Sequence, residues 1–209
     1  MILIQESIAQ LLDCDTGELS ITLRFEPGQS LNKGVDSAGM STLQPPESRL
    51  LLQQMAGALL HLHARSLVHD DVKPENIIWI ATERRAVLVD FGAALDFTCL
   101  PPDYFHPSGT PSYAPPEFLK REKGPKADIW ALGVVILFTM GYLPLPDGNW
   151  LLPAALEEGE ERSEMLRWLN KIETLRSERI TAGGPLSRML AADPEARVGS
   201  RDLLEQLRP

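Results

Sequence analysis

The chain has 209 residues, of which 44% are hydrophobic and 23% charged, a balance typical of a folded soluble protein that buries a core. Its formal net charge is −9 and its pI is about 5.0, whereas nucleic-acid-binding proteins normally carry a basic face and anionic membranes attract basic segments. We therefore expect neither nucleic acid nor a membrane among its partners.

The N-terminal part of the chain predicts a β-hairpin, a loop and then a helix. Two short apolar runs, residues 7–13 and 19–25, flank the turn-forming residues 15–18. Residues 34–46 are rich in Gly, Ser and Pro and predict a loop. After this loop the apolar residues recur at helical spacing: Leu50, Leu51, Met55, Ala58, Leu59 and Leu62.

The middle of the chain predicts two short strands and an irregular segment. The β-like runs are residues 77–80 and 86–89, and a polar turn at residues 82–85 separates them. Residues 93–116 are rich in proline and lack a clear period, so they predict irregular structure.

The C-terminal part predicts helices. Residues 126–140 are strongly apolar and predict a buried helix, and residues 160–180 predict an amphipathic one. A Gly-Gly-Pro run at 183–185 ends the second helix, and a final pair of helices reaches residue 207. Few strands followed by many helices indicate an α+β fold that is mainly helical.

Cysteine usage and the absence of targeting signals predict a soluble intracellular protein, in the cytoplasm or the nucleus. Cys14 and Cys99 lie far apart without C-x-x-C spacing, so they predict neither a disulfide framework nor a zinc site. The N-terminus lacks the basic flank of a signal peptide. The longest apolar stretch, residues 130–140, is shorter than the ~20 residues of a membrane span.

Three segments carry residue types that suit phosphoryl transfer. They are residues 69–76 (HDDVKPEN), 90–92 (DFG) and 109–117 (GTPSYAPPE). In this order and spacing they resemble the catalytic loop, the metal-binding segment and the APE segment of the eukaryotic protein kinase family. Residues 128–133 (DIWALG) and 193–197 (DPEAR) fit the same resemblance, which covers essentially the whole chain and implies a protein-kinase-like fold.

The resemblance implies that Asp71 and Lys73 are catalytic. Asp71 matches the carboxylate that orients the acceptor hydroxyl and takes its proton, and Lys73 matches a lysine that contacts the γ-phosphate in Ser/Thr kinases. Phosphoryl transfer depends on positioning and on neutralising charge around the γ-phosphate, which these residue types can provide. Lys73, together with Thr110 before Pro111, favours a serine or threonine acceptor over tyrosine.

The resemblance also implies that the cofactors are ATP and Mg²⁺. Asn76 and Asp90 match the two metal ligands, and hard oxygen donors suit Mg²⁺. Residues 25–31 resemble the hinge between the kinase lobes. The residues that would contact ATP come from the hinge region and from the floor and phosphate end of the cleft: Leu23, Glu26, Ile78, Lys73 and Asn76.

Other matches to the family are architectural. Asp128 would hold the backbone of the catalytic loop from the buried helix. Glu117 and Arg197 would form a partly buried ion pair, in which removal of one partner leaves an uncompensated charge. Three residues resemble the hydrophobic column that links the two lobes: His69, Phe91 and Leu11.

The chain departs from the family in its N-terminal lobe. Residues 1–31 resemble only a remnant of that lobe, with the hinge and a hairpin like its fourth and fifth strands, whereas residues 32–209 resemble the C-terminal lobe. No G-x-G-x-x-G or V-A-I-K run occurs in the sequence, and in kinases these parts cover and contact the phosphates. One explanation is that the chain is a fragment of a longer kinase. Another is that a partner completes the lobe.

A second departure is Asp70, which stands where most family members have an arginine that binds a phosphate on the activation segment. Asp70 and Asp71 together would repel such a phosphate. The sequence therefore predicts no activation through Thr98, Ser108 or Thr110, and it predicts that alanine at each position leaves activity unchanged.

Two functions stay open on the sequence. The first is a Ser/Thr-kinase-like enzyme that transfers the ATP γ-phosphate to a protein hydroxyl and needs a partner to complete the N-terminal lobe. The alternative is a pseudokinase that acts as a non-catalytic protein-binding scaffold. The expected partners are a protein substrate or scaffold partner, a second copy of the chain, or a chain that supplies the missing lobe. A homodimer interface would include residues 2–25.

Overall fold

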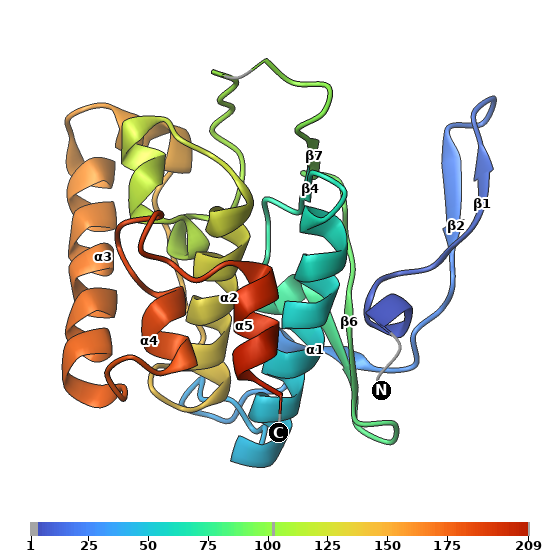
Figure 1. The fold of residues 1–209 in the computed structure, drawn as a ribbon, viewed down its shortest axis with the longest axis horizontal. Helices are drawn as coiled ribbons and strands as arrows, with labels where there is room; N and C mark the ends of the chain where they lie inside the picture. The colour runs from blue at the N-terminus through green and yellow to red at the C-terminus, as the bar shows by residue number, and fades with distance from the viewer. Residues whose placement is uncertain (1–3, 102, 209) are drawn as a thin grey trace.

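Figure 1 shows a helical body with a β-hairpin that lies apart from it at one side. The structure, a computed structural model, describes residues 4–101 and 103–208. Its helical part, which agrees with the predicted mainly helical α+β class, is built from α1 (Pro45–His63), α2 (Pro125–Thr139), α3 (Glu160–Arg179), α4 (Pro185–Met189) and α5 (Ser200–Gln206).

The strands form small antiparallel sheets. The projecting hairpin pairs β1 (Leu11–Asp15) with β2 (Ser20–Leu23). A second sheet has the order β3-β5-β6 and contains β3 (Gln29–Ser30), β5 (Ile77–Ile80) and β6 (Arg85–Leu88). A third pairs β4 (Leu67–Val68) with β7 (Leu95–Asp96). Short 3-10 turns connect these elements: Ile4–Ser7, Leu31–Lys33, Pro74–Asn76, Pro111–Tyr113, Pro116–Lys120 and Leu152–Leu156.

Helix α2 is the centre of the core. Every residue from Ala127 to Thr139 is buried. A helix that is apolar on all sides must be surrounded by other elements, and α1 and α4 pack against it. No helix in the described part of the chain is both long and apolar enough to cross a membrane.

Helix α1 begins earlier than its apolar pattern alone indicates. Pro45 occupies the first turn, where its missing N–H is not needed. The backbone N–H of Gln44 donates to the Glu47 carboxylate at 2.8 Å, which completes a capping box. Across the helix, the buried Ser48 hydroxyl donates to the carbonyl of Thr139 at 2.6 Å and so joins the start of α1 to the end of α2.

The predicted first strand, residues 7–13, is only partly correct. Ile4–Ser7 form a 3-10 turn, and the N–H of Ala9 donates to the carbonyl of Leu88 at 2.9 Å, so this segment pairs with the edge of β6. The hairpin proper begins at Leu11, and its turn is stabilised by the Asp15 carboxylate, which accepts N–H groups from the turn residues.

The proline-rich segment is not entirely irregular, because it contains β7. Leu95 and Asp96 pair with Val68 and Leu67 of β4. Two-residue strands are too short to show an alternating pattern, so the sequence predicts only a loop here.

Candidate active site

The β5–β6 hairpin places the two predicted metal ligands at one end of a sheet. Asn76 immediately precedes β5, and Asp90 follows β6. The strands pair with Ile77 opposite Leu88, and the N–H of Val89 donates to the Asn76 carbonyl at 2.9 Å. Antiparallel pairing therefore brings these residues together although they are far apart in sequence.

Asp128, in the first turn of α2, binds the backbone of the catalytic loop. Its buried carboxylate, 1% exposed, accepts the N–H groups of His69 and Asp70, each at 2.9 Å. His63 lies 2.8 Å from the same carboxylate through Nε2. This confirms the predicted role of Asp128 and supports the left-handed backbone of Asp70, whose φ is 65°.

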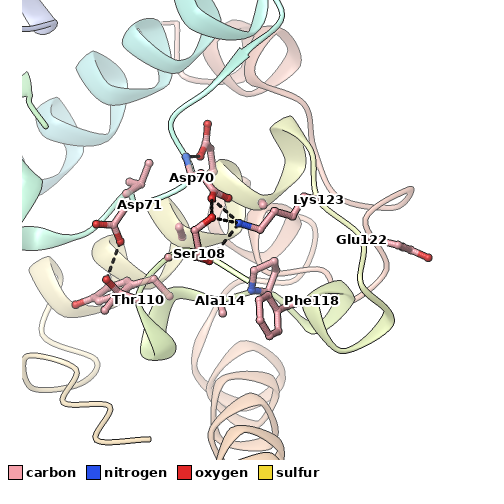
Figure 2. Close-up of a pocket in the computed structure, with 15 residues that line it drawn as sticks. Asp70, Asp71, Ser108, Thr110, Ala114, Phe118, Glu122 and Lys123 are labelled. Carbon is pink, nitrogen blue, oxygen red and sulfur yellow. Dashed lines mark hydrogen bonds and ion pairs between the residues drawn. The ribbon is translucent and has the colours of Figure 1, made fainter. Parts of the chain in front are cut away.

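Asp71 lies at the centre of a polar cluster. One carboxylate oxygen accepts the hydroxyl of Thr110 at 2.6 Å, and the other lies 2.7 Å from Lys73 Nζ. Lys73 also donates to the Thr110 hydroxyl at 2.9 Å. Asn76 Nδ2 donates to the Asp71 carbonyl at 2.9 Å and to its carboxylate at 3.2 Å. Figure 2 shows Asp71 and Thr110 facing each other. The three predicted residues Asp71, Lys73 and Asn76 therefore lie together.

The donor set at the end of the β5–β6 hairpin fits Mg²⁺. The Asn76 amide nitrogen faces Asp71. The remaining amide oxygen is a hard donor of the kind that Mg²⁺ prefers, and Asp90 is an exposed residue that adds a carboxylate. No group of three or more His, Cys, Asp or Glu side chains with metal-ligand geometry occurs among residues 4–101 and 103–208. Mg²⁺ commonly takes only one or two carboxylates and completes its shell with phosphates and water.

The other predicted nucleotide contacts differ in their surroundings. Ile78 is half-buried in β5. Leu23 ends β2 on the projecting hairpin and is 41% exposed. The Glu26 side chain is 5% exposed and forms ion pairs with Arg24 and Arg85, each at 2.8 Å. Because that carboxylate is already paired, its contact with a nucleotide would be through the backbone.

Of the predicted hydrophobic column, two of the three residues, His69 and Phe91, are in contact. The rings of His69 and Phe91 meet edge to face, with centroids 5.0 Å apart. Leu11, the third predicted member, is 56% exposed on β1, so its assignment to this column is wrong. The hairpin carrying Leu11 projects away from the body (Figure 1).

The predicted ion pair between Glu117 and Arg197 is present and buried. Arg197 donates to both carboxylate oxygens, at 2.6 and 2.8 Å, and the side chains are 5% and 0% exposed. The guanidinium also lies over the ring of Trp130, 5.1 Å from its centroid. Bidentate geometry of this kind is the strongest form of such a pair.

Asp70 has partners that the sequence does not reveal. Its carboxylate contacts the ammonium of Lys123 and accepts the Ser108 hydroxyl at 2.5 Å. Burial raises the pKa of Asp70 and lowers the pKa of Lys123. Only the unusual Asp at position 70 hints at a compensating cation, and nothing in the spacing selects Lys123.

This fold and site define the class of protein. A loop held by a buried aspartate presents a carboxylate, a lysine and an amide beside a second carboxylate, which is the arrangement of a protein-kinase-type phosphoryl-transfer site. The family model described as "Protein kinase domain" matches residues 4–207. The chain belongs to the protein kinase family.

Several curated relatives are Ser/Thr kinases or other protein kinases. CBL-interacting protein kinase 12 of Oryza sativa subsp. japonica is 34% identical over 78% of this chain and 29% of its own length. Maternal embryonic leucine zipper kinase of Xenopus tropicalis is 33% identical over 90% of this chain and 27% of its own. Probable serine/threonine-protein kinase MARK-A of Dictyostelium discoideum is 34% identical over 52% of this chain and 10% of its own length. The chain thus spans less than a third of the length of these relatives.

Proposed function

We propose that the chain is a Ser/Thr-kinase-like phosphotransferase that transfers the γ-phosphate of ATP to a protein serine or threonine hydroxyl. The observation that carries this proposal is the arrangement around Asp71. Its carboxylate lies within 2.7 Å of Lys73 Nζ and accepts the Thr110 hydroxyl at 2.6 Å. A general base and a neighbouring cation in fixed positions are what this reaction requires of the protein.

In this mechanism Asp71 orients the acceptor hydroxyl and receives its proton as the hydroxyl oxygen bonds to the γ-phosphorus and the β–γ bridging bond breaks. Lys73 offsets negative charge on the transferred group. Asn76 and Asp90 would hold Mg²⁺, which neutralises the phosphates when bound. Because Lys73 contacts both Asp71 and Thr110, its ammonium is oriented before a substrate arrives.

We further propose that the nucleotide is covered by a second chain, either another copy or a chain that supplies an N-terminal lobe. The 209 residues contain no Gly-rich phosphate loop. The projecting hairpin supports this proposal because its apolar residues are exposed, with Leu19 at 91% and Ile21 at 66%. A displaced triphosphate reacts slowly, since an error of about 1 Å can reduce the rate on the order of a hundredfold.

The alternative function is a pseudokinase scaffold that binds proteins without turnover. The same exposed hairpin favours this alternative, because large apolar side chains on a sheet with open edges commonly mark protein-binding surfaces. In this alternative the Asp71 cluster would be a remnant whose substitution has no effect on binding.

A phosphate-transfer assay with radiolabelled ATP and pooled Ser- and Thr-containing peptides separates the two functions. We expect Asp71→Asn to reduce transfer by at least about a hundredfold, because a general base typically contributes that much. The matched control is Asp202→Asn, the same change at an exposed position in the first turn of α5. Transfer by the wild-type chain that Asp71→Asn leaves unchanged would come from a contaminating kinase and would refute the proposal. A folded wild-type chain without transfer to any pool would favour the scaffold.

A further inference from the structure

Asp70, Ser108 and Lys123 form a buried polar cluster, here called the clamp, beside the catalytic residues (Figure 2). The Lys123 ammonium contacts the Asp70 carboxylate, donates to the Ser108 carbonyl at 3.1 Å and lies 2.8 Å from the Ser108 hydroxyl. The side chains of Asp70 and Lys123 are each 4% exposed. An ammonium has three N–H donors, so this site uses all of them.

The clamp joins both ends of the segment that presents Thr110. Ser108 begins this segment, and Lys123, which follows the 3-10 turn Pro116–Lys120, ends it. Asp70 belongs to the catalytic loop and contacts both. Thr110 lies between the two ends, and its hydroxyl donates to Asp71 at 2.6 Å. The position of Thr110 relative to Asp71 therefore depends on how firmly the clamp holds the chain.

Gly109 shows how closely the segment approaches the catalytic loop. Its φ is 106°, a conformation that side chains disfavour, and a Cβ atom there would lie 3.1 Å from the Asp70 carbonyl oxygen. The backbone next to Ser108 thus has little space in which to shift, provided that Lys123 keeps both segments in place.

The electrostatics of the clamp indicate a positioning role. Lys123 faces the carboxylates of Asp70, Asp71 and Asp128, which favour its charged form, while burial opposes it and lowers its pKa. A buried pair of this kind gains little net stability, because desolvation offsets the attraction, but loss of one partner leaves an uncompensated charge. What the pair provides is a defined geometry between two segments.

We propose that Lys123 is a positioning residue whose ammonium, supplied from within the chain, holds residues 108–123 against the catalytic loop without any phosphate group. Negative charge added at Ser108 competes with Asp70 for the same ammonium and loosens the segment. The effect on phosphate transfer rests on the proposed function, whereas the ordering of the segment does not.

Hydrogen–deuterium exchange of the full chain tests the clamp without a nucleotide or substrate. We expect Lys123→Met to raise exchange in residues 104–118 by at least about tenfold, because the segment then opens more often. The matched control, Lys120→Met, removes the same charge at an exposed position and should leave exchange unchanged. Asp70→Asn combined with Lys123→Met should exchange no faster than the Lys123 variant alone. Additive effects would show that the two residues act independently, which contradicts the clamp.

Ser108 supplies a second test that holds even if Lys123→Met fails to fold. Ser108→Asp and Ser108→Asn differ essentially in charge, and only the aspartate should raise exchange in the same region by about tenfold. Slower exchange with aspartate would mean that added charge orders the segment, and it would overturn the proposal. Unchanged exchange in Ser108→Asp, or in a folded Lys123→Met, would do the same. A wild-type chain that transfers no phosphate would favour the scaffold function and leave the exchange result standing.

Discussion

The catalytic loop and the β1–β2 hairpin show opposite ways of using polar and apolar groups. In the loop, the N–H groups of His69 and Asp70 both bind one carboxylate that is 1% exposed. In the hairpin, Leu19 is 91% and Ile21 66% exposed, and the sheet contains only two strands. An isolated two-stranded sheet is at best marginally stable.

This difference distinguishes a region that is held by contacts within the chain, the catalytic loop, from a region that is not, the β1–β2 hairpin. Residues of the loop are positioned by contacts within the chain, so the site geometry is formed before any ligand binds. The hairpin exposes apolar surface that a neighbouring sheet or chain could cover. The following predictions test this contrast by disturbing one region at a time.

The largest effect on stability is expected from breaking the buried ion pair between Glu117 and Arg197. Glu117→Ala should lower the free energy of unfolding by about 3–5 kcal/mol, because Arg197 is left buried without its partner. Urea unfolding measures this change. Glu160→Ala is the control, since its pair with Arg167 is exposed and should contribute less than about 1 kcal/mol. Equal losses in the two variants would contradict the contrast between buried and exposed pairs.

A smaller effect is expected where the hinge segment meets β5. An alanine Cβ at Gly28 would lie 2.5 Å from the Trp79 carbonyl oxygen, so the backbone must shift. Gly28→Ala should reduce stability by about 1–3 kcal/mol in thermal or urea unfolding. Gly124→Ala is a suitable comparison because a Cβ there meets no atom within 4 Å. If Gly28→Ala had wild-type stability, the backbone at Gly28 and Trp79 would have room to separate without cost, which contradicts the close contact.

Thr110 and Thr98 should respond differently to alanine. The sequence predicts no effect at either position, but the Thr110 hydroxyl links Asp71 to Lys73. We therefore revise the first expectation: Thr110→Ala should lower the phosphate-transfer rate by about tenfold, the value of one hydrogen bond to a charged group. Thr98→Ala, whose side chain binds the exposed Asp96, should retain the wild-type rate. A large loss at Thr98 would point to activation by phosphorylation.

The smallest change in stability is expected on the hairpin. Ile21→Ser should alter the free energy of unfolding by no more than about 0.5 kcal/mol, because the side chain is 66% exposed. If the hairpin is the surface that binds a second copy, the same variant weakens association in sedimentation velocity. A wild-type chain that is monomeric at all concentrations would contradict the homodimer and leave a different chain as the partner.

Local pattern predicts much of this fold from sequence, and long-range pairing explains the errors. The predicted strand 77–80 coincides with β5. The predicted helix 126–140 differs from α2 by one residue at each end, and the predicted helix 160–180 extends one residue beyond α3. A strand of two residues spans a single period and shows no repeated alternation, so the pairing of β4 with β7 could not be predicted.

The candidate site shows the same division. Asp71, Lys73 and Asn76 belong to one short motif, and the structure brings them together. Lys123 lies more than fifty positions from Asp70, in a run of mixed charges that resembles any solvated surface segment. Its burial depends on how the intervening chain folds, and that information is not local.

The most direct test is calorimetric titration of Mg²⁺-ATP into the purified chain and into the Asp90→Asn variant. It shows whether the catalytic loop and the end of the β5–β6 hairpin form a nucleotide site without a second chain. We expect micromolar binding to the wild-type chain and its loss in the variant, because Asp90 would hold the metal that would neutralise the phosphates. No binding to a folded wild-type chain, or equal binding to both proteins, would contradict a preformed site at the end of the β5–β6 hairpin.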